Sequence, residues 1–323
     1  MNVASKVRIP ASDPTPAPSG LTPAQRRDGG LLRFAIAISV LNILGHLWLG
    51  FEQSWATPFI ALAAAYGTEL AGEWASARFA GRGPRFAGSP AGAARFLLSA
   101  HITGLAVGML LYAAEQLWVV AFAASLAIAS KYILRVSFGE DGSTRHFYNP
   151  SNFGIAATLI LFPMVGIAQP YQFAENISGA LDWLLPLIVI TTGTLINRKF
   201  TQRLPLIGAW LAAFALQAVT RALVHGNPIL AGLAPMTGFA FILFTFYMIT
   251  DPATTPEGRW EQRCFGAAVG LAYALMMELH IVFGLFFALA LVSTLRGALL
   301  ALKAQRWRPL WPFKPAAAQS HAG

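Results

Sequence analysis

Residues 145–154 (RHFYNPSNFG), here named the NP segment, form the first of two polar clusters that could carry chemistry. Asn149 followed by Pro150 is typical of a helix start, because an Asn side chain accepts hydrogen bonds from free backbone N–H groups and proline fits the first turn. Asn152 follows within that first turn. A helix start beside an apolar bundle can also bind an anion or a carbonyl-rich ring. A capped helix and a ligand contact are therefore both open at this segment.

Residues 246–256 (FYMITDPATTP) form the second cluster, named the TDP segment. Thr250 and Asp251 end a long apolar run, and an acidic residue in that place is a candidate functional residue. The alternative is that Asp251 and Pro252 only form a turn at a helix end that water reaches. The spacing of the residues favours neither interpretation.

Charged residues also interrupt the apolar runs. Glu69 and Glu73 are four residues apart, so they share one face of a helix. Because an unpaired charge inside a membrane is costly, we expect Glu69 to face the protein interior, a partner or water. We expect Glu73 and Lys131 to extend their charged groups to the membrane surface.

Metal and nucleotide chemistry have little support in this sequence. Arg221 with His225 and Glu278 with His280 lack the spacing of a zinc site, which needs three or four converging ligands, so we expect solvated pairs. The one cysteine, Cys264, excludes an internal disulfide and a Cys-ligated cluster within the chain. The sequence contains no nucleotide-binding or hydrolase motif. We therefore predict no metal site and no hydrolytic or ATP-driven mechanism.

The composition indicates which elements must position these residues. The chain has 323 residues, of which 56% are hydrophobic and only 11% are charged, and its mean hydropathy is +0.55. Soluble domains carry roughly 25% charged residues. The composition therefore excludes a soluble enzyme, a disordered chain and a disulfide scaffold, and it predicts an all-α polytopic membrane protein with lipids around it.

A bilayer-spanning helix needs about 20 mostly apolar residues, and ten segments meet this description. They are 31–50, 55–75, 96–113, 117–135, 152–169, 182–197, 204–222, 231–250, 264–279 and 281–301. Pro235 and Gly238 predict a broken or re-entrant helix in the eighth segment. Residues 1–30, rich in Pro, Ser and Gly, are expected to be a flexible cytoplasmic tail, and residues 302–323 a cytoplasmic C-terminal tail.

The basic residues indicate the orientation. All 23 Lys and Arg residues except Arg221 fall in the tails and the alternate connections that would share one side of a membrane. Cytoplasmic loops carry the excess of basic residues, so both termini are predicted to be cytoplasmic. This distribution also accounts for the net charge of +9 without a nucleic-acid partner. The predicted location is the bacterial inner (cytoplasmic) membrane.

The NP and TDP segments together resemble the RnfD/NqrB superfamily of membrane electron-transfer subunits. Members carry an FNP-type motif before a middle span and a TDP-x-[ST]-x-P motif after a later one. NPSNFGI and FYMITDPATTP are most similar to the UnbU branch, RnfD-like proteins of enediyne biosynthesis clusters. The similarity covers roughly residues 95–295, and the first spans match in hydropathy more than in motif.

The resemblance implies two inverted five-helix repeats, which the predicted segments place at 31–169 and 182–301. It also implies a noncovalent flavin near the cytoplasmic side, where Asn149, Asn152, Thr250 and Asp251 match the motifs. The superfamily further esterifies an FMN to the Thr of an S-G-A-T motif between the fifth and sixth spans. Residues 178–181 read SGAL here, and Leu181 has no hydroxyl, so no covalent FMN is expected.

Two functions remain open at this point. The first is a redox module in which a flavin passes electrons to or from partner subunits or a biosynthetic oxidoreductase. The protein would then orient the ring while the flavin supplies the redox chemistry. The second is a carrier or exporter, in which the inverted repeats form a path for a small or hydrophobic product without redox chemistry.

Overall fold

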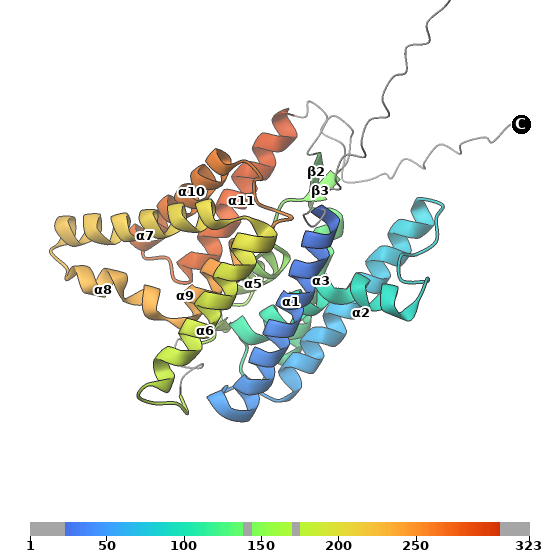
Figure 1. Ribbon diagram of the computed structural model, residues 1–323, viewed down its shortest axis with the longest axis horizontal. Helices are drawn as coiled ribbons and strands as arrows, with labels where there is room; N and C mark the ends of the chain where they lie inside the picture. The colour runs from blue at the N-terminus through green and yellow to red at the C-terminus, as the bar shows by residue number, and fades with distance from the viewer. Residues whose placement is uncertain (1–22, 138–143, 170–174, 304–323) are drawn as a thin grey trace, which may run out of the picture.

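The computed structural model describes residues 23–137, 144–169 and 175–303, and most of these residues are helical (Figure 1). Five helices belong to the first predicted half of the chain, and the first of them ends in a π-helical turn. They are α1 (Pro23–Leu44) with η1 (Gly45–Leu49), α2 (Ala56–Phe79), α3 (Pro90–Leu110), α4 (Leu117–Ile133) and α5 (Pro150–Leu161).

The described part of the second half contains four continuous helices and one interrupted helix. Its elements are α6 (Leu181–Ile196) with η3 (Asn197–Thr201), α7 (Leu204–His225), α8 (Ile229–Leu233) with η4 (Ala234–Thr237), α9 (Phe239–Leu243) with η5 (Phe244–Met248), α10 (Arg259–Glu278) and α11 (Gly284–Lys303). The sequence did not predict two short antiparallel pairs. Strand β1 (Leu111–Tyr112) pairs with β4 (Gly166–Ile167), and β2 (Arg135–Ser137) pairs with β3 (Thr144–His146).

Every predicted apolar segment contains a helix, but fewer helices meet the length and hydropathy of a membrane span. Among the described residues, four do so by themselves: Asp28–Leu49, Pro90–Leu110, Leu204–His225 and Gly284–Lys303. A fifth span is possible if the bent pair Ile229–Thr237 and Phe239–Met248 counts as one. The structure thus confirms a helical protein with four or five helices that could cross a membrane.

The predicted break in the eighth segment is confirmed. The two parts of the bent pair meet at 67°. Gly238 joins them with an extended backbone (φ −74°, ψ 139°), and Pro235 lies in the turn before it. Proline removes a backbone donor and an extended residue stops the helical hydrogen bonding, so the helix axis changes direction here.

The fifth segment differs from its predicted bounds, because its helix ends at Leu161 instead of continuing to residue 169. Phe162 leaves the helical region (φ −126°, ψ 85°), and Pro163 follows it. A residue before proline is pushed out of the α conformation by the proline ring. The chain beyond this point enters β4.

Two G-x-x-x-G patterns, at residues 104–108 of α3 and 266–270 of α10, form close helix contacts. A Cβ atom on Gly104 would lie 3.0 Å from the Ala61 carbonyl oxygen of α2, and one on Gly266 would lie 2.4 Å from the Leu206 carbonyl oxygen of α7. Only glycine lets the backbones approach to this distance. These glycines therefore fix the packing of α3 on α2 and of α10 on α7.

Helices α1 and α6 lie beside each other and run in opposite directions. In the first half of α1, Gly29 and Gly30 lie against Phe200, in the π-helical turn that ends α6, and the Arg33 guanidinium lies 4.6 Å from the centroid of the same ring. At the other end, Gly50 follows α1 and lies against Asn176, which precedes α6. Each helix therefore begins where the other ends.

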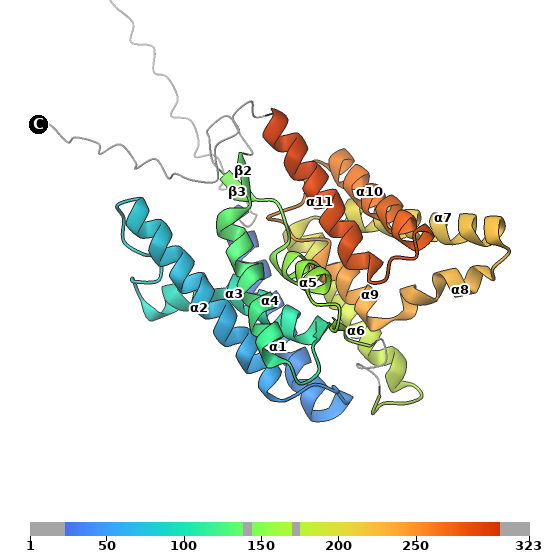
Figure 2. The ribbon, with the colours of Figure 1, turned by 180° about the vertical axis from the view of Figure 1, so that it is seen from behind.

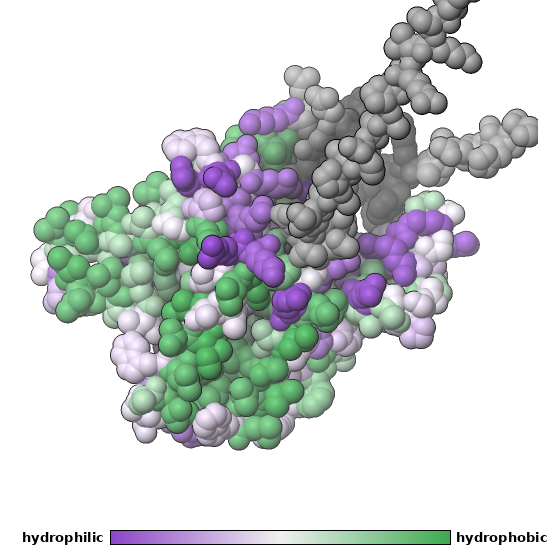
Figure 3. Space-filling view, viewed as in Figure 1, coloured by the Kyte–Doolittle hydropathy of each residue, from purple (hydrophilic) through white to green (hydrophobic). Residues whose placement is uncertain are grey.

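Polar surface gathers at one side of the molecule. The start of α1, the end of α11 and the β2–β3 pair lie on the same side in Figures 1 and 2. Figure 3 shows hydrophilic residues concentrated toward that side of the visible face, with hydrophobic residues covering much of the rest. The visible face of the described residues thus separates into a polar side and a largely apolar remainder, as expected for a membrane protein.

Candidate functional site

Asn149 caps α5 as the sequence predicts. Its side-chain Oδ1 accepts a hydrogen bond from the Asn152 backbone N–H at 3.0 Å and another from the Ser151 hydroxyl at 2.8 Å. Pro150 is the first residue of the helix. Asn149 and Asn152 are both buried. The structural role of the NP segment is therefore established by the geometry, and any ligand contact would be an additional role.

The remaining polar groups of these two asparagines join α5 to other helices. Asn149 Nδ2 donates to the Met248 carbonyl oxygen at 3.1 Å, and Asn152 Nδ2 donates to the Phe286 carbonyl oxygen of α11 at 3.1 Å. Met248 is the last residue of η5, and the last carbonyls of a helix have no partner within that helix. The NP segment thus contacts the TDP segment directly.

Asp251 organises the turn that follows η5. Its carboxylate accepts hydrogen bonds from the Ala253 backbone N–H at 3.0 Å and from the Thr254 hydroxyl at 3.2 Å. Its backbone carbonyl accepts from the Thr255 hydroxyl at 2.6 Å. Thr250 donates its hydroxyl to the Phe246 carbonyl one helical turn back, at 2.8 Å. These bonds are typical of an Asx turn, so the turn-forming interpretation of Asp251 is also realised.

Two arginines whose places in the sequence indicate only membrane topology bind this turn. Arg203, buried at the start of α7, donates from Nε to the Thr255 hydroxyl at 2.8 Å and from Nη2 to the Pro252 carbonyl at 3.4 Å. Arg296 of α11 donates from Nη1 to the Thr254 carbonyl at 2.8 Å. The turn therefore lies against two guanidinium groups, which gives this end of the protein a fixed positive charge.

The electrostatic environment of Arg203 reflects this arrangement. Burial lowers the pKa of the Arg203 guanidinium, and the carboxylates of Glu257 and Asp251 oppose that shift. Arginine stays protonated in proteins, so the buried cation needs the oxygen atoms that surround it. The sequence gives little sign that Arg203 binds this turn, because a basic residue before an apolar segment is expected from membrane topology alone.

A second group of charges lies between α2 and α4. Lys131 Nζ is 2.5 Å from Glu69 Oε2 and 3.3 Å from the Ser99 hydroxyl, while the Tyr132 hydroxyl donates to Glu69 Oε1 at 3.1 Å. The expectation that Glu69 faces a partner is confirmed. The expectation that Lys131 extends to the surface is wrong, because α2 supplies its counter-ion and only 12% of its side chain is exposed.

Glu73 also differs from its expected position. Its side chain is fully buried and forms ion pairs with Arg82 at 2.6 Å and Arg85 at 2.7 Å. Both arginines follow α2, and the chain folds back so that their guanidinium groups reach the carboxylate. A paired and hydrogen-bonded carboxylate has no reason to extend to the membrane surface.

The four predicted site residues are thus brought to neighbouring positions, with most of their polar atoms bound to protein groups. Asn149 meets the TDP segment through Met248, whereas Asn152 contacts α11. Asn152 Oδ1 is the exception, because it is buried without a hydrogen-bond partner among the described residues. A ring N–H is the kind of group that this oxygen lacks. Among the four residues, Asn152 Oδ1 is therefore the atom at which a flavin ring could add a hydrogen bond.

A scan of protein-family models and a search of curated proteins give no match for this chain. Among the described residues, the structure also contains no group of three or more His, Cys, Asp or Glu side chains that could hold a metal ion.

Proposed function

We propose that this chain is a multi-pass membrane protein of the RnfD/NqrB superfamily, closest to its UnbU branch, and that it is a flavin-associated electron-transfer subunit in enediyne biosynthesis. The observation that carries the proposal is the hydrogen bond between Asn149 and Met248, which lie 99 residues apart in the chain. The resemblance depends on the NP and TDP segments, and a shared cytoplasmic site requires them to be neighbours.

The proposed architecture is ten spans in two inverted repeats, 31–169 and 182–301. The antiparallel arrangement of α1 and α6 supports it, because the first helices of inverted repeats must run in opposite directions. Packing supports it as well. The second helix packs on the fourth in each half, α2 on α4 and α7 on α10.

The ends of α1 and α6 provide independent support, because both close with the same turn. The Phe51 backbone N–H donates to the Gly45 carbonyl at 3.0 Å, and the Arg203 backbone N–H donates to the Asn197 carbonyl at 3.1 Å. The residue before each donor, Gly50 or Gln202, has a positive φ. Two helices with unrelated local sequences thus end alike, as repeats of one ancestral unit would.

The proposed location is the bacterial inner membrane, with both termini in the cytoplasm. The concentration of hydrophilic surface at the side of the β2–β3 pair supports this orientation (Figure 3). Arg203 and Arg296 at the TDP segment also belong to the basic residues that mark the cytoplasmic side. Partner subunits or a soluble oxidoreductase would then approach the Asn149–Met248 junction from that side.

A flavin supplies the one- and two-electron redox chemistry that no side chain of this chain provides. Asn152 Oδ1 would accept a hydrogen bond from the ring, while Asn149, Thr250 and Asp251 hold the helix ends around it. The flavin would be noncovalent, since Leu181 lacks the hydroxyl needed for an ester. Purification from membranes in mild detergent tests the proposal. We expect flavin absorbance that denaturation releases into solution. A monodisperse protein without flavin absorbance would contradict the proposed redox function.

The biosynthetic role has a separate test. Genes for an enediyne polyketide synthase are expected next to the gene for this chain. Their absence would contradict the role in enediyne biosynthesis and would leave the electron-transfer proposal unchanged.

The break at Gly238 favours a second function, a carrier or exporter of a hydrophobic product. Interrupted helices form the substrate sites of many transporters, because their free backbone groups face the substrate. A colourless protein whose deletion traps product inside the cell would favour this function over electron transfer.

A further inference from the structure

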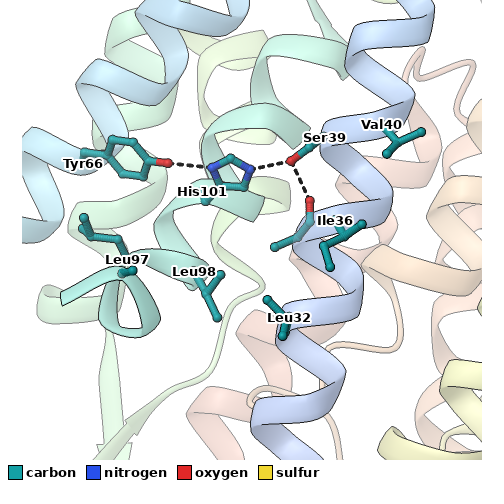
Figure 4. A pocket seen from close by; sticks show the side chains of 10 residues that line it. Leu32, Ile36, Ser39, Val40, Tyr66, Leu97, Leu98 and His101 are labelled. Atoms are coloured by element: carbon teal, nitrogen blue, oxygen red, sulfur yellow. Dashed lines mark hydrogen bonds between the residues drawn. The ribbon is translucent and has the colours of Figure 1, made fainter. Parts of the chain in front are cut away.

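A cavity of about 500 Å³ lies between α1, α2 and α3, and neither Asn149 nor Met248 lines it (Figure 4). Leu32, Ile36 and Val40 of α1 form one wall, and Leu97 and Leu98 of α3 form part of the opposite wall. The three α1 side chains are each about half exposed, and α1 is long and apolar enough to cross a membrane. The cavity therefore opens toward the lipid.

Three polar side chains form a hydrogen-bonded row across this cavity (Figure 4). The Tyr66 hydroxyl lies 2.6 Å from His101 Nδ1, and His101 Nε2 lies 2.7 Å from the Ser39 hydroxyl oxygen. The Ser39 hydroxyl lies 2.7 Å from the Ala35 carbonyl oxygen. Each of these side chains comes from a different helix, so the row joins α1, α2 and α3.

The direction of the row follows from the number of hydrogens. Ser39 has one hydroxyl hydrogen, which must go to Ala35 because a carbonyl oxygen can only accept. Ser39 Oγ therefore accepts from His101 Nε2–H. In a neutral imidazole the other nitrogen is an acceptor, so Tyr66 donates its hydrogen to His101 Nδ1. Every donor in the row is used, whereas the Tyr66 oxygen keeps its acceptor capacity.

We propose that this cavity binds a membrane-dissolved hydrophobic molecule whose polar end is a hydroxyl group. The apolar walls would hold the hydrocarbon part, and the hydroxyl would donate to the Tyr66 oxygen. A molecule with only acceptor oxygens, such as a quinone or an ester, finds no spare donor in the row. The volume lies within the range of about 300–1,000 Å³ that holds small ligands. The inference does not depend on the proposed electron-transfer function.

Photolabelling of the full-length protein in lipid nanodiscs tests this site. The label is an alkylphenol that carries a diazirine, and the competitors are 4-nonylphenol, nonylbenzene and 2-decyl-1,4-benzoquinone. We expect labelled peptides from α1 and α3. We expect 4-nonylphenol to compete at a concentration about five- to tenfold lower than the other two, since one net hydrogen bond is worth that factor.

Three variants separate the parts of the proposal. Tyr66→Phe combined with His101→Leu removes the Tyr66 oxygen and also His101 Nδ1, which would otherwise become a free acceptor once Tyr66 no longer donates to it. This double substitution should abolish the advantage of 4-nonylphenol over nonylbenzene. Tyr112→Phe, a tyrosine outside the cavity, should retain it. Ala94→Trp fills the cavity from α3 and should abolish labelling. Size-exclusion profiles verify that each variant is folded. Equal competition by all three compounds in the unmodified protein would overturn the hydroxyl specificity, and labelling that survives Ala94→Trp would overturn the site.

Discussion

Asn149 donates a hydrogen bond to the carbonyl oxygen of Met248 while its own side-chain oxygen caps α5. One buried amide thus starts one helix and holds the end of another. The contact joins the two segments that carry the family resemblance. It also explains why an asparagine is needed, because Asp would keep the cap and lose the donor, whereas Ser or Thr would be too short to do both.

The loss of stability on replacing Asn149 should therefore depend on which of its two interactions the new residue keeps. Asn149→Ala loses the cap and the contact with Met248, and we expect a loss of about 2–3 kcal/mol in the free energy of unfolding. Asn149→Asp should lose less, since its carboxylate still caps the helix. Thermal unfolding of the purified proteins measures both. Equal stability of Asn149→Ala and the unmodified protein would contradict the junction.

Flavin content should depend on Asn152 more than on its neighbours in α5. Asn152→Ala removes the unpaired oxygen, so we expect most of the noncovalent flavin to be lost on purification. Thr158→Val is the control, because it removes a different buried polar atom without a partner, a hydroxyl, from the same helix. Flavin absorbance per mole of folded protein is the measurement. Loss of flavin in both variants would indicate a general packing effect.

Breaking the Lys131–Glu69 pair from one side should destabilise the protein. Lys131→Met or Glu69→Gln leaves one buried charge without its partner, which costs about 3–5 kcal/mol. The double variant should recover part of that loss. Glu257→Gln serves as the control, because the Arg145–Glu257 pair is exposed at 3.6 Å and should contribute below about 1 kcal/mol. Additive effects of the two single substitutions would show that the pair is not coupled.

No flavin should remain attached to the denatured chain. Leu181 occupies the place of the acceptor threonine, and its side chain cannot form an ester. A denaturing gel under ultraviolet light should therefore show no fluorescent band, whereas the supernatant of the same sample should contain free flavin. A fluorescent band would mean that another hydroxyl is the attachment point.

Reporter fusions can measure the orientation. A reporter fused after Lys303 should be active only in the cytoplasm, and one fused after Gly226, in a connection of the opposite side, should be active only outside it. The prediction depends on the one-sided distribution of basic residues. A C-terminus outside the cytoplasm would end the ten-span arrangement.

The sequence was sufficient to predict those features of the protein that depend only on residues close together in the chain. Apolar runs long enough for a bilayer located the helices, the Asn149–Pro150 pair located the start of α5, and Pro235 with Gly238 located the break before α9. In each case the interactions responsible, backbone hydrogen bonds or the burial of an apolar run, involve residues within a few helical turns of one another in the chain. The sequence therefore determined these elements by itself.

Packing between distant helices decided the rest. Hydropathy does not specify which helix faces which, so it could not place Arg203 and Arg296 against the TDP segment, nor Lys131 against Glu69. The same limit applies to the cavity between α1, α2 and α3, whose hydrogen-bonded row takes one side chain from each helix. These partners meet only when the helices pack, because a buried charge or hydroxyl selects its neighbour by geometry in three dimensions.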